Sequence, residues 1–446
     1  MHFFVCKPKP ENTVAVEMRL WYDVNIQIYY SNRFANPVIE FVNSFYVLIS
    51  YIQSSRKLMF GGTSMKFFHL SDLHIGLKLF NRDLLEDQQH ILKQITEIAG
   101  RKRPDAVVIA GDIYDKAVPP AEAVAVFDAF IADLTAAVPD AVIMMISGNH
   151  DSAPRVNLFR SVLSRQRIHM VGVAPQQPQD YIEKVTIADA YGPVNFYLLP
   201  FVKPSMVKSV VGTDENGINF SYNETVHRLI ERESVDGGER NVLVSHQFYI
   251  PKGTDPESVA RMDSEIRTVG NIDEVSADIL HRFDYAALGH IHKPMKVGGE
   301  FYRYCGTPLA CSVSEAGQQK GIVVVEMREK GSVLTDVIPL KPLREVRLVR
   351  GELEEVLQQA CADYVTVILT DKVDLNVIDM QDRIRNAFPN LLEIRRETQR
   401  KADYSKKFSA GKNLDPFELC CSFLKEADDL ERDLLKDVIR TIQEEQ

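Results

Sequence analysis

The chain has 446 residues, of which 45% are hydrophobic, and a formal net charge of -10 at pH 7. This length allows roughly two or three domains with cores of their own. The acidic balance argues against a protein that binds nucleic acid through a general basic surface, but not against a nuclease whose cations come from bound metal or a partner. The six cysteines include no CxxC pair, which favours reduced thiols over a disulfide framework.

The first part of the chain differs from the rest. Residues 1–64 contain the single tryptophan and show no clean helical or strand period. Either Met65 is the true start and the upstream residues are read through as coding sequence, or this leader is a small accessory segment. The longest apolar tract, residues 39–52, is too short for a membrane span and is broken by polar residues, so we expect a cytoplasmic protein.

From Met65 onward the hydrophobic pattern alternates between strand and helix periods. Strands are predicted at residues 66–72, 105–112, 141–151, 194–200, 241–247, 284–290, 321–327 and 332–340. Amphipathic helices are predicted at 83–100, with Gly100 as the stop, and at 119–138. This alternation indicates a layered α/β domain with parallel early strands over residues 65–342, and ligands bind such sheets beyond the carboxyl ends of the strands.

The pattern changes after Pro342. Residues 343–397 predict a small separate α/β domain with strands at 344–351, 364–371 and 391–397 and helices at 352–361 and 377–388. The polar, basic residues 398–413 are typical of a linker. Residues 414–446 have the spacing of one or two amphipathic helices.

Short polar motifs follow five of the predicted strands. They supply seven candidate metal ligands, namely Asp72, His74, Asp112, Asn149, His246, His290 and His292. Carboxylate, amide and imidazole donors suit Mn²⁺, Fe²⁺ or Zn²⁺. Seven donors are too many for one ion but suit two ions with one shared carboxylate, the arrangement that promotes in-line attack on phosphorus. A single histidine at a strand end is more often structural, and we interpret His69 as a core residue.

The order D-x-H, G-D-x-x-D, G-N-H-D, S-H, G-H-x-H resembles the calcineurin-like metallophosphoesterases. More closely, "FHLSDLHIGLKL", "VIAGDIYDKAVPP", "SGNHDSAPRV", "LGHIHKP" and "YCGTPLACSVSE" are similar to the SbcD family of bacterial nuclease subunits. The resemblance runs from Met65 to the C-terminus. It implies a layered α/β/β/α sandwich with a small α/β capping domain and C-terminal helices.

The resemblance also implies roles for the candidate ligands, with Mn²⁺ as the expected metal. Asp72, His74 and His292 would hold one ion, whereas Asn149, His246 and His290 would hold the other, and Asp112 would bridge the two. His150 would be a non-ligand imidazole that faces the scissile phosphate. Asp151 would orient His150, or it would simply cap a turn. Asp115 stands where archaeal and eukaryotic relatives tend to carry a histidine, so a second catalytic imidazole stays in doubt.

The family further implies contacts with macromolecules. The basic residues of the capping domain are candidates to contact DNA phosphates, although a solvated charged face is an equal alternative; they are Arg344, Arg347, Arg350, Lys372, Arg383 and Arg385. The C-terminal helices would bind an SbcC-like SMC ATPase or fold back on their own domain, and their apolar candidates are Phe417, Leu419, Phe423 and Leu424. Dimerisation within a heterotetramer would use helices at 83–99 and 154–165, whose periodicity serves equally well for packing inside a monomer.

The leading interpretation is a Mn²⁺-dependent DNA nuclease with double-strand exonuclease and single-strand or hairpin endonuclease activity. It would be the hydrolytic half of an ATP-dependent, nucleoid-associated complex in DNA repair and recombination. A small-molecule phosphodiesterase and a non-catalytic scaffold of the same fold are the alternatives. The protein-phosphatase signature G-D-x-x-D-R-G is absent, since the chain reads "GDIYDKA".

Overall fold

The computed structural model describes residues 64–255, 262–263, 265, 273–371, 377–397, 432 and 435–436. The expectations for the leader, the linker, Lys372 and the apolar residues of the C-terminal helices therefore lie outside the described residues. Among the residues that are described, no helix combines the length and the apolarity that crossing a bilayer requires.

The first sheet has six strands in the order β16-β15-β1-β4-β5-β6. Their bounds are β1 (Met65–Leu70), β4 (Ala106–Ala110), β5 (Val142–Ile146), β6 (Ile168–Val171), β15 (Gly321–Met327) and β16 (Val333–Pro339). Neighbouring pairs from β1 to β6 are parallel, whereas β15 is antiparallel to both β1 and β16. Every residue of β4 and β5 is buried, as expected for parallel strands covered on both faces.

The second sheet also has six strands, in the order β13-β14-β12-β9-β8-β7. Their bounds are β7 (Glu183–Asp189), β8 (Gly192–Leu199), β9 (Arg240–His246), β12 (Tyr285–Gly289), β13 (Met295–Lys296) and β14 (Tyr302–Tyr304). The two sheets share one apolar core between them. In this core the ring of Phe67 from the first sheet packs edge-on against Phe196 and Tyr285 of the second, at centroid distances of 5.2 and 5.6 Å.

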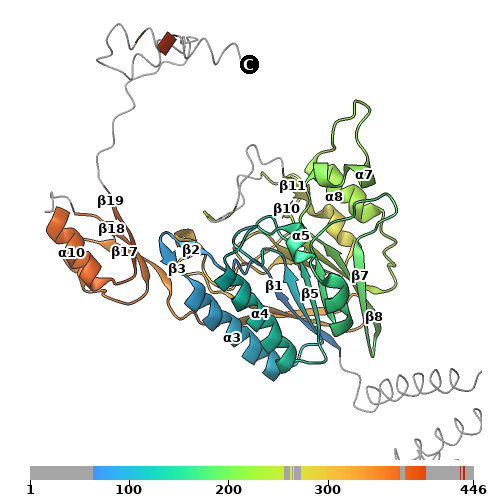
Figure 1. Cartoon of the computed structure of the whole chain (residues 1–446), viewed down its shortest axis with the longest axis horizontal. Helices are drawn as coiled ribbons and strands as arrows, with labels where there is room; N and C mark the ends of the chain where they lie inside the picture. Colours follow the sequence, from blue (N-terminus) through green and yellow to red (C-terminus); the bar gives the residue numbers. More distant parts are fainter. Residues whose placement is uncertain are drawn as a thin grey trace, which may run out of the picture.

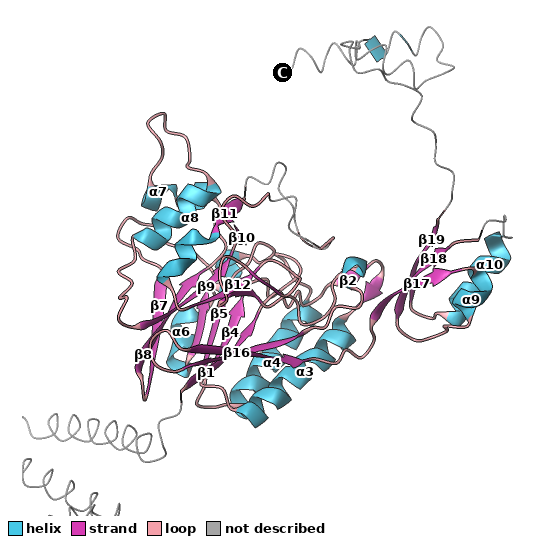
Figure 2. Ribbon diagram, turned by 180° about the vertical axis from the view of Figure 1, so that it is seen from behind, coloured by secondary structure: helices cyan, strands magenta, loops and turns pink. Residues whose placement is uncertain are grey.

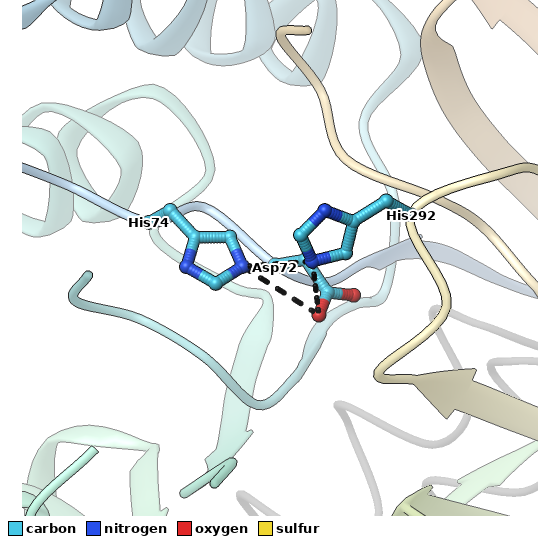
Figure 3. A group of neighbouring side chains, drawn as sticks. All are labelled: Asp72, His74 and His292. Carbon is cyan, nitrogen blue, oxygen red and sulfur yellow. Dashed lines mark hydrogen bonds and ion pairs between the residues drawn. The ribbon is translucent and has the colours of Figure 1, made fainter. Parts of the chain in front are cut away.

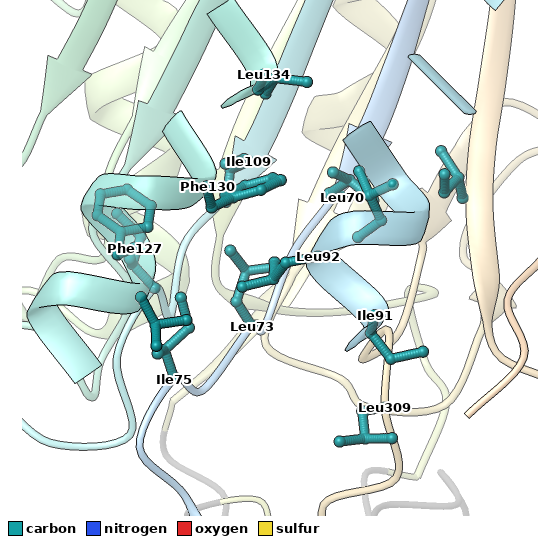
Figure 4. Close-up of a cluster of buried hydrophobic side chains, with 14 of the residues drawn as sticks. Leu70, Leu73, Ile75, Ile91, Leu92, Ile109, Phe127, Phe130, Leu134 and Leu309 are labelled. Atoms are coloured by element: carbon teal, nitrogen blue, oxygen red, sulfur yellow. The ribbon is translucent and has the colours of Figure 1, made fainter. Parts of the chain in front are cut away.

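Helices cover the outer faces of both sheets. Helices α3 (Leu85–Lys102) and α4 (Ala121–Ala137) lie side by side over the first sheet (Figure 1), and their apolar side chains form a second core with the strands (Figure 4). Helix α8 (Tyr222–Glu231) packs on the second sheet through a third core. The predicted α/β/β/α sandwich is confirmed.

The remaining elements of this part are β2 (Lys78–Leu79), β3 (Arg82–Asp83), α5 (Ala153–Val156), α6 (Arg160–Leu163), η1 (Ser164–Gln166), η2 (Pro204–Met206), α7 (Lys208–Val211), β10 (Phe248–Ile250), β11 (Glu274–Ser276), η5 (Ala277–Arg282) and η6 (Val313–Glu315).

Gly100 does not end its helix, contrary to the prediction. Helix α3 continues to Lys102 and ends at Arg103, which adopts the left-handed conformation with φ 47°. Pro104 follows directly and cannot continue the helix. A methyl group on Gly100 would lie 3.8 Å from Cβ of Ala137 on α4, so the glycine sits where the two helices pack closely.

Residues 343–397 form a separate three-stranded sheet with its own core (Figure 2). The strands β17 (Val346–Gly351), β18 (Tyr364–Leu369) and β19 (Leu391–Arg396) are all parallel, and α9 (Leu353–Leu357) and α10 (Val377–Ala387) pack on them. The predicted order of elements agrees with this arrangement. Helix α9 is shorter than the predicted 352–361.

This small sheet contacts the start of α3. The hydroxyl of Tyr364 donates to Oδ2 of the buried Asp87 at 2.8 Å, and Nη1 of Arg344 lies 3.4 Å from the same oxygen. Arg344 also pairs with Glu86, and Arg82 donates to the carbonyl of Pro389 at 2.9 Å. Arg344 therefore takes part in the contact between the two parts of the chain, and its contact with DNA phosphates stays a prediction.

A buried ion pair joins both sheets at the amino ends of β1 and β9. The guanidinium of Arg240 donates to both carboxylate oxygens of Asp189, at 2.9 and 2.5 Å, and both side chains are almost fully buried. Arg240 also donates to the carbonyls of Gly192 and Arg328, and the backbone N–H of Met65 donates to Asp189. Removal of one partner leaves an uncompensated charge in the core.

We expect Arg240→Met to lower the free energy of unfolding by about 3–5 kcal/mol, because Asp189 keeps its buried charge. Chemical denaturation measures this loss. The matched control is Arg228→Met, which breaks a pair with Glu224 whose side chains are 43% and 45% exposed and should cost less than about 1 kcal/mol. Equal effects of the two variants would contradict the assigned role of the buried pair.

His69 lies between the two sheets, as predicted for a core residue. Its Nδ1 lies 3.0 Å from the Tyr285 hydroxyl and its Nε2 lies 3.2 Å from the Leu288 carbonyl. Since a carbonyl only accepts, Nε2 carries the proton and Nδ1 accepts from the tyrosine. Burial lowers the pKa of His69 to about 3, so the ring is neutral in the folded protein.

This shift gives a dependence of stability on pH. The unfolded chain binds a proton at His69 below about pH 6.5 and the folded chain does not, so stability falls as the pH drops from 6.5 towards 3, by up to about 1.4 kcal/mol per pH unit. We expect His69→Gln to remove this slope. The measurement is the free energy of unfolding of chelator-treated wild type and His69→Gln from pH 7 to pH 4.5. The two curves should converge towards low pH, and two parallel curves would refute the assignment.

Candidate metal centre

The candidate ligands lie at the carboxyl ends of strands from both sheets. Asp72 and His74 follow β1, whereas Asp112 follows β4 and Asn149 follows β5. His246 is the last residue of β9, and His290 and His292 follow β12. Six of these seven side chains are buried, with Asn149 partly exposed. The structure brings all seven predicted residues into one cluster, because the two packed sheets present these strand ends at the same edge.

One half of the cluster contains Asp72, His74 and His292 (Figure 3). The Nε2 atoms of His74 and His292 lie 3.1 Å apart. Oδ1 of Asp72 lies 4.0 Å from Nε2 of His74 and 3.9 Å from Nε2 of His292. Two imidazole nitrogens and one carboxylate oxygen therefore face the same small space, a donor arrangement that fits a divalent cation.

The other half gathers around Asn149. Its Oδ1 lies 3.0 Å from Nε2 of His246 and 2.9 Å from Nδ1 of His290. Asp112 connects this half to the first, since its Oδ2 lies 3.3 Å from Nε2 of His246 and 3.7 Å from Nε2 of His74. A single carboxylate thus faces imidazoles of both halves.

The backbone that carries these groups adopts unusual conformations. Asp72, His74, Asp112 and His290 have positive φ angles of 52°, 43°, 50° and 100°. They are four of the eight non-glycine residues with positive φ in the described part of the chain. Such conformations cost of order 1–3 kcal/mol each and persist only where the surrounding structure fixes them. Backbone hydrogen bonds do so here, from Asp72 N to the Gly111 carbonyl and from His74 N to the Asp112 carbonyl, at 2.9 and 3.0 Å.

Two glycines allow this close approach of the loops. A Cβ at Gly148 would lie 2.1 Å from Oδ1 of Asp112, and a Cβ at Gly289 would lie 2.0 Å from the carbonyl oxygen of Ala110. Real Cβ atoms do not tolerate such distances. The glycines of "SGNHD" and "LGHIH" are therefore required by packing next to the ligands, independently of any turn that they make.

The electrostatics of the cluster are those of a cation site. Burial alone would raise the pKa of Asp112, but the neighbouring imidazole of His246 outweighs it and holds the pKa below its ordinary value. Burial likewise opposes the charged form of His246, whereas Asp112 raises its pKa to about 9. The pKa of His74 falls well below its ordinary value because of burial and the nearby His292. A divalent ion can replace the proton shared by such pairs, so the residues present fit divalent metals.

His150 lies beside this cluster. Its ring stands edge-on to the ring of His74 at a centroid distance of 4.8 Å, and it is half-buried. Nδ1 of His150 lies 2.9 Å from the backbone carbonyl of Asp115, so Nδ1 carries a proton. Position 115 thus orients His150 through its main chain, a contact that does not depend on the side-chain type at that position.

The contacts of Asp151 agree with the second of the two roles expected for it, that of a turn cap. Its carboxylate accepts hydrogen bonds from the backbone N–H groups of Ile113, Tyr114 and Gly148, at 2.9 to 3.0 Å. Both oxygens are therefore used to join the loop after β4 to the loop after β5, and the partner that orients His150 is Asp115. This geometry corrects the orienting role of Asp151 and favours the turn-capping alternative.

Two polar residues near the ligands were missed by the sequence analysis. Gln88, on the buried side of α3, donates to the carbonyl of His74 at 2.6 Å and accepts from the N–H of Gly76 at 2.9 Å. Glu315 is 1% exposed and lies 3.6 Å from Nδ1 of His292. A glutamine within the apolar stripe of a helix is a visible signal for Gln88. Glu315 is the last residue of the stretch "YCGTPLACSVSE", which carried part of the family resemblance but assigned the glutamate no role.

The other basic candidates that lie within the described residues, four arginines of the small domain, have acidic partners. Arg347 pairs with Asp363, Arg350 with Glu397, Arg383 with Glu354 and Arg385 with Asp382. Their side chains are at least 40% exposed. Exposed pairs of this kind contribute little to stability and exchange readily. The pairing agrees with the solvated charged face that was the alternative interpretation.

We expect Mn²⁺ to stabilise the chelator-treated protein, by about 2.7 kcal/mol at a concentration of 100 times Kd. Asp112→Asn keeps the shape of the side chain but removes the charge shared by both halves, so most of this stabilisation should be lost. Thermal unfolding with and without Mn²⁺ measures it. Asp133→Asn, an exposed change on α4, is the control and should behave as wild type. An undiminished response of Asp112→Asn to Mn²⁺ would argue against this centre.

Two family models and curated relatives match this chain. Residues 65–294 match the family model described as calcineurin-like phosphoesterase, and residues 339–427 match the one described as type 5 capsule protein repressor C-terminal domain. The SbcD subunit of the SbcCD nuclease from Staphylococcus epidermidis is 28% identical over 352 residues, which are 77% of this chain and 88% of that protein. Its namesake from Staphylococcus saprophyticus is 30% identical over 344 residues, or 75% and 85% of the two chains.

The solved structure of TT1561 from Thermus thermophilus aligns with 62% of this chain and 99% of its own, at 12% identity and a TM-score of 0.35. That score is too low to add to the sequence matches. The matched range ends at Pro294, so that it covers β1, β4, β5 and β6 of the first sheet and β7, β8, β9 and β12 of the second. It includes all seven candidate ligands. The chain is therefore a hydrolase that belongs to the calcineurin-like phosphoesterase family, and the SbcD nuclease subunits are among its relatives.

Proposed function

We propose that the chain is a DNA nuclease that hydrolyses phosphodiester bonds with two divalent metal ions, Mn²⁺ in particular. The observation that carries this proposal is the position of the Asp112 carboxylate, within 3.7 Å of imidazoles in both halves of the cluster. Curated relatives named as the SbcD subunit of the SbcCD nuclease support DNA as the substrate. We propose double-strand exonuclease and single-strand or hairpin endonuclease activities, in DNA repair and recombination.

The proposed ligand sets follow the two halves of the cluster. Asp72, His74 and His292 would hold one ion, Asn149, His246 and His290 the other, and Asp112 both. Two bound divalent ions supply Lewis acidity to the phosphoryl oxygens and lower the pKa of water near the phosphorus. Buried donors fixed on strained backbone hold their positions with little reorganisation, which favours this chemistry.

His150 would act on the leaving oxygen. The Asp115 carbonyl keeps a proton on Nδ1, so Nε2 is the atom that holds and delivers a proton or stabilises the developing charge. The ring is half-buried and stands next to His74, which leaves one side open to a substrate. Asp151 supports this arrangement indirectly, because it fixes the loop from which His150 projects.

We further propose the assembly of a nuclease subunit in an SbcC–SbcD-type complex. Residues 343–397 would cap the active site and position DNA, with Arg347, Arg350 and Arg383 exchanging their acidic partners for phosphates. The segment after residue 413 would bind an SbcC-like ATPase. Leu158, Phe159 and Val162 are exposed by more than half, which supports a homodimer contact at residues 154–165. The location would be the cytoplasm, at the nucleoid.

The nuclease proposal is tested with the full chain, Mn²⁺ and three substrates: an end-labelled duplex, a DNA hairpin and bis-p-nitrophenyl phosphate. We expect wild type to cut all three. His150→Ala should keep both metals and lose about 10²- to 10⁴-fold in rate, because the leaving oxygen loses its proton donor. His281→Ala, which changes an exposed histidine on η5, is the control and should keep full activity.

Other outcomes identify other functions. Cleavage of the small diester alone, also after addition of an SbcC-like ATPase, would indicate a small-molecule phosphodiesterase. Two bound metals without any hydrolysis would indicate a scaffold that keeps the fold. Equal rates for wild type and His150→Ala would remove His150 from the mechanism.

A further inference from the structure

A buried ion pair lies directly behind one of the candidate ligands. Glu315 is 1% exposed and Lys320 is 6% exposed, and Oε2 of the glutamate lies 2.6 Å from Nζ of the lysine. Charges in the protein interior are costly unless each is paired and hydrogen-bonded. The proposed chemistry at the metals uses neither residue, so their burial next to the site needs its own explanation.

Both members of the pair contact His292. Oε1 of Glu315 lies 3.6 Å from Nδ1 of its ring, and Nζ of Lys320 donates to its backbone carbonyl at 3.1 Å. The remaining contacts anchor the carboxylate. Oε2 accepts from the hydroxyl of Thr307 at 2.9 Å, and Oε1 accepts from the N–H of Cys311 at 3.2 Å.

The two ring nitrogens of His292 face different groups. Nε2 faces Asp72 and His74, at 3.9 and 3.1 Å, whereas Nδ1 faces Glu315. The ammonium of Lys320, 2.6 Å from Oε2 of Glu315, balances the negative charge of the carboxylate. An ionised carboxylate can only accept, so it keeps the ring proton on Nδ1 and leaves the lone pair of Nε2 directed into the cluster.

A third metal site at this place is excluded by the same contacts. His292, Cys311 and Glu315 lie close enough to share an ion. However, the ammonium of Lys320 already occupies Glu315 and repels a cation.

We propose that Glu315 is a positioning residue for His292: it fixes the tautomer and ring orientation that a metal at Nε2 requires, and Lys320 keeps it charged and in place. This inference rests on the proposed metal centre. Removal of a carboxylate that orients a ligating histidine in this way typically lowers metal affinity about 10–100-fold. Glu315 should therefore affect the metal of the His292 half and leave the metal of the His246 half unchanged.

The test compares two double variants of the full chain that both lack the ion pair. Glu315→Gln with Lys320→Met keeps an oxygen that accepts from Nδ1–H, whereas Glu315→Leu with Lys320→Met removes it. Calorimetric titration with Mn²⁺, with bound ions counted by electron paramagnetic resonance, measures both sites. We expect the leucine variant to lose about 10–100-fold in affinity at one of two sites. The glutamine variant should stay much closer to wild type.

Glu233→Gln is the control for the loss of a buried carboxylate far from the cluster, where Glu233 accepts from the N–H of Ile182. It should lower the unfolding temperature without changing Mn²⁺ binding. Equal Mn²⁺ affinities of the two double variants would overturn the proposal and make Glu315 a purely structural residue. If the leucine variant does not fold, Glu315→Gln alone is the test. Its amide oxygen must accept from Lys320, so its NH2 group faces Nδ1–H of His292 and cannot accept. A tenfold loss of affinity supports the proposal, and unchanged affinity overturns it.

These outcomes are separate from the test of the nuclease proposal. Absence of DNA cleavage with two bound Mn²⁺ ions would remove the proposed substrate and leave the role of Glu315 intact. Absence of Mn²⁺ binding by wild type would remove the metal centre and the role of Glu315 with it.

Discussion

The carboxylate of Asp112 is the group on which the rest of the site depends. Its Oδ2 lies within 3.7 Å of Nε2 of both His74 and His246, and its Oδ1 accepts the backbone N–H of His150 at 2.8 Å. One side chain therefore connects loops that follow β1, β4 and β5 with a strand of the second sheet. Because Asp112 is 1% exposed and sits on left-handed backbone, its position is set by the fold and not by a rotamer choice at the surface. The candidate metal centre therefore needs the charge of Asp112, its strained backbone and the packing of the two sheets together.

Several polar contacts hold the loops that carry Asp112 and the other candidate ligands in place. Asp151 joins the loops after β4 and β5 through three backbone hydrogen bonds, and Gln88 holds the loop of His74 from helix α3. At the amino ends of β1 and β9, the buried ion pair of Arg240 and Asp189 connects the two sheets. The site is thus supported by polar groups that are not among the seven candidate ligands. This arrangement is expected where donors must keep their positions before a charged ligand arrives.

Most of the fold could be predicted from the sequence, because its signals are local. Residues 106–110 are an apolar strand, and the polar motif with Asp112 follows directly in the sequence. The two adjacent signals together predicted Asp112 as a ligand at a strand end. Residues that act across the fold could not be found in this way. Glu315 meets His292 only after the second sheet has brought distant segments together, and Arg344 meets Asp87 only when the small domain contacts α3. The pattern of charges shows that such residues are polar, but not which partner each one faces.

The strand order of the first sheet also determines when the active site can exist. β1 lies between β4, which follows soon in the chain, and β15, which begins only at Gly321. Translation adds about 5–20 residues per second, so on the order of ten seconds or more separate the synthesis of Asp72 from that of His292. During that interval one edge of β1 has no partner, and the pairing that closes it is long-range and therefore slow to form. The complete first sheet around the site therefore cannot form before the ribosome has passed Met327, the end of β15, in a chain of 446 residues.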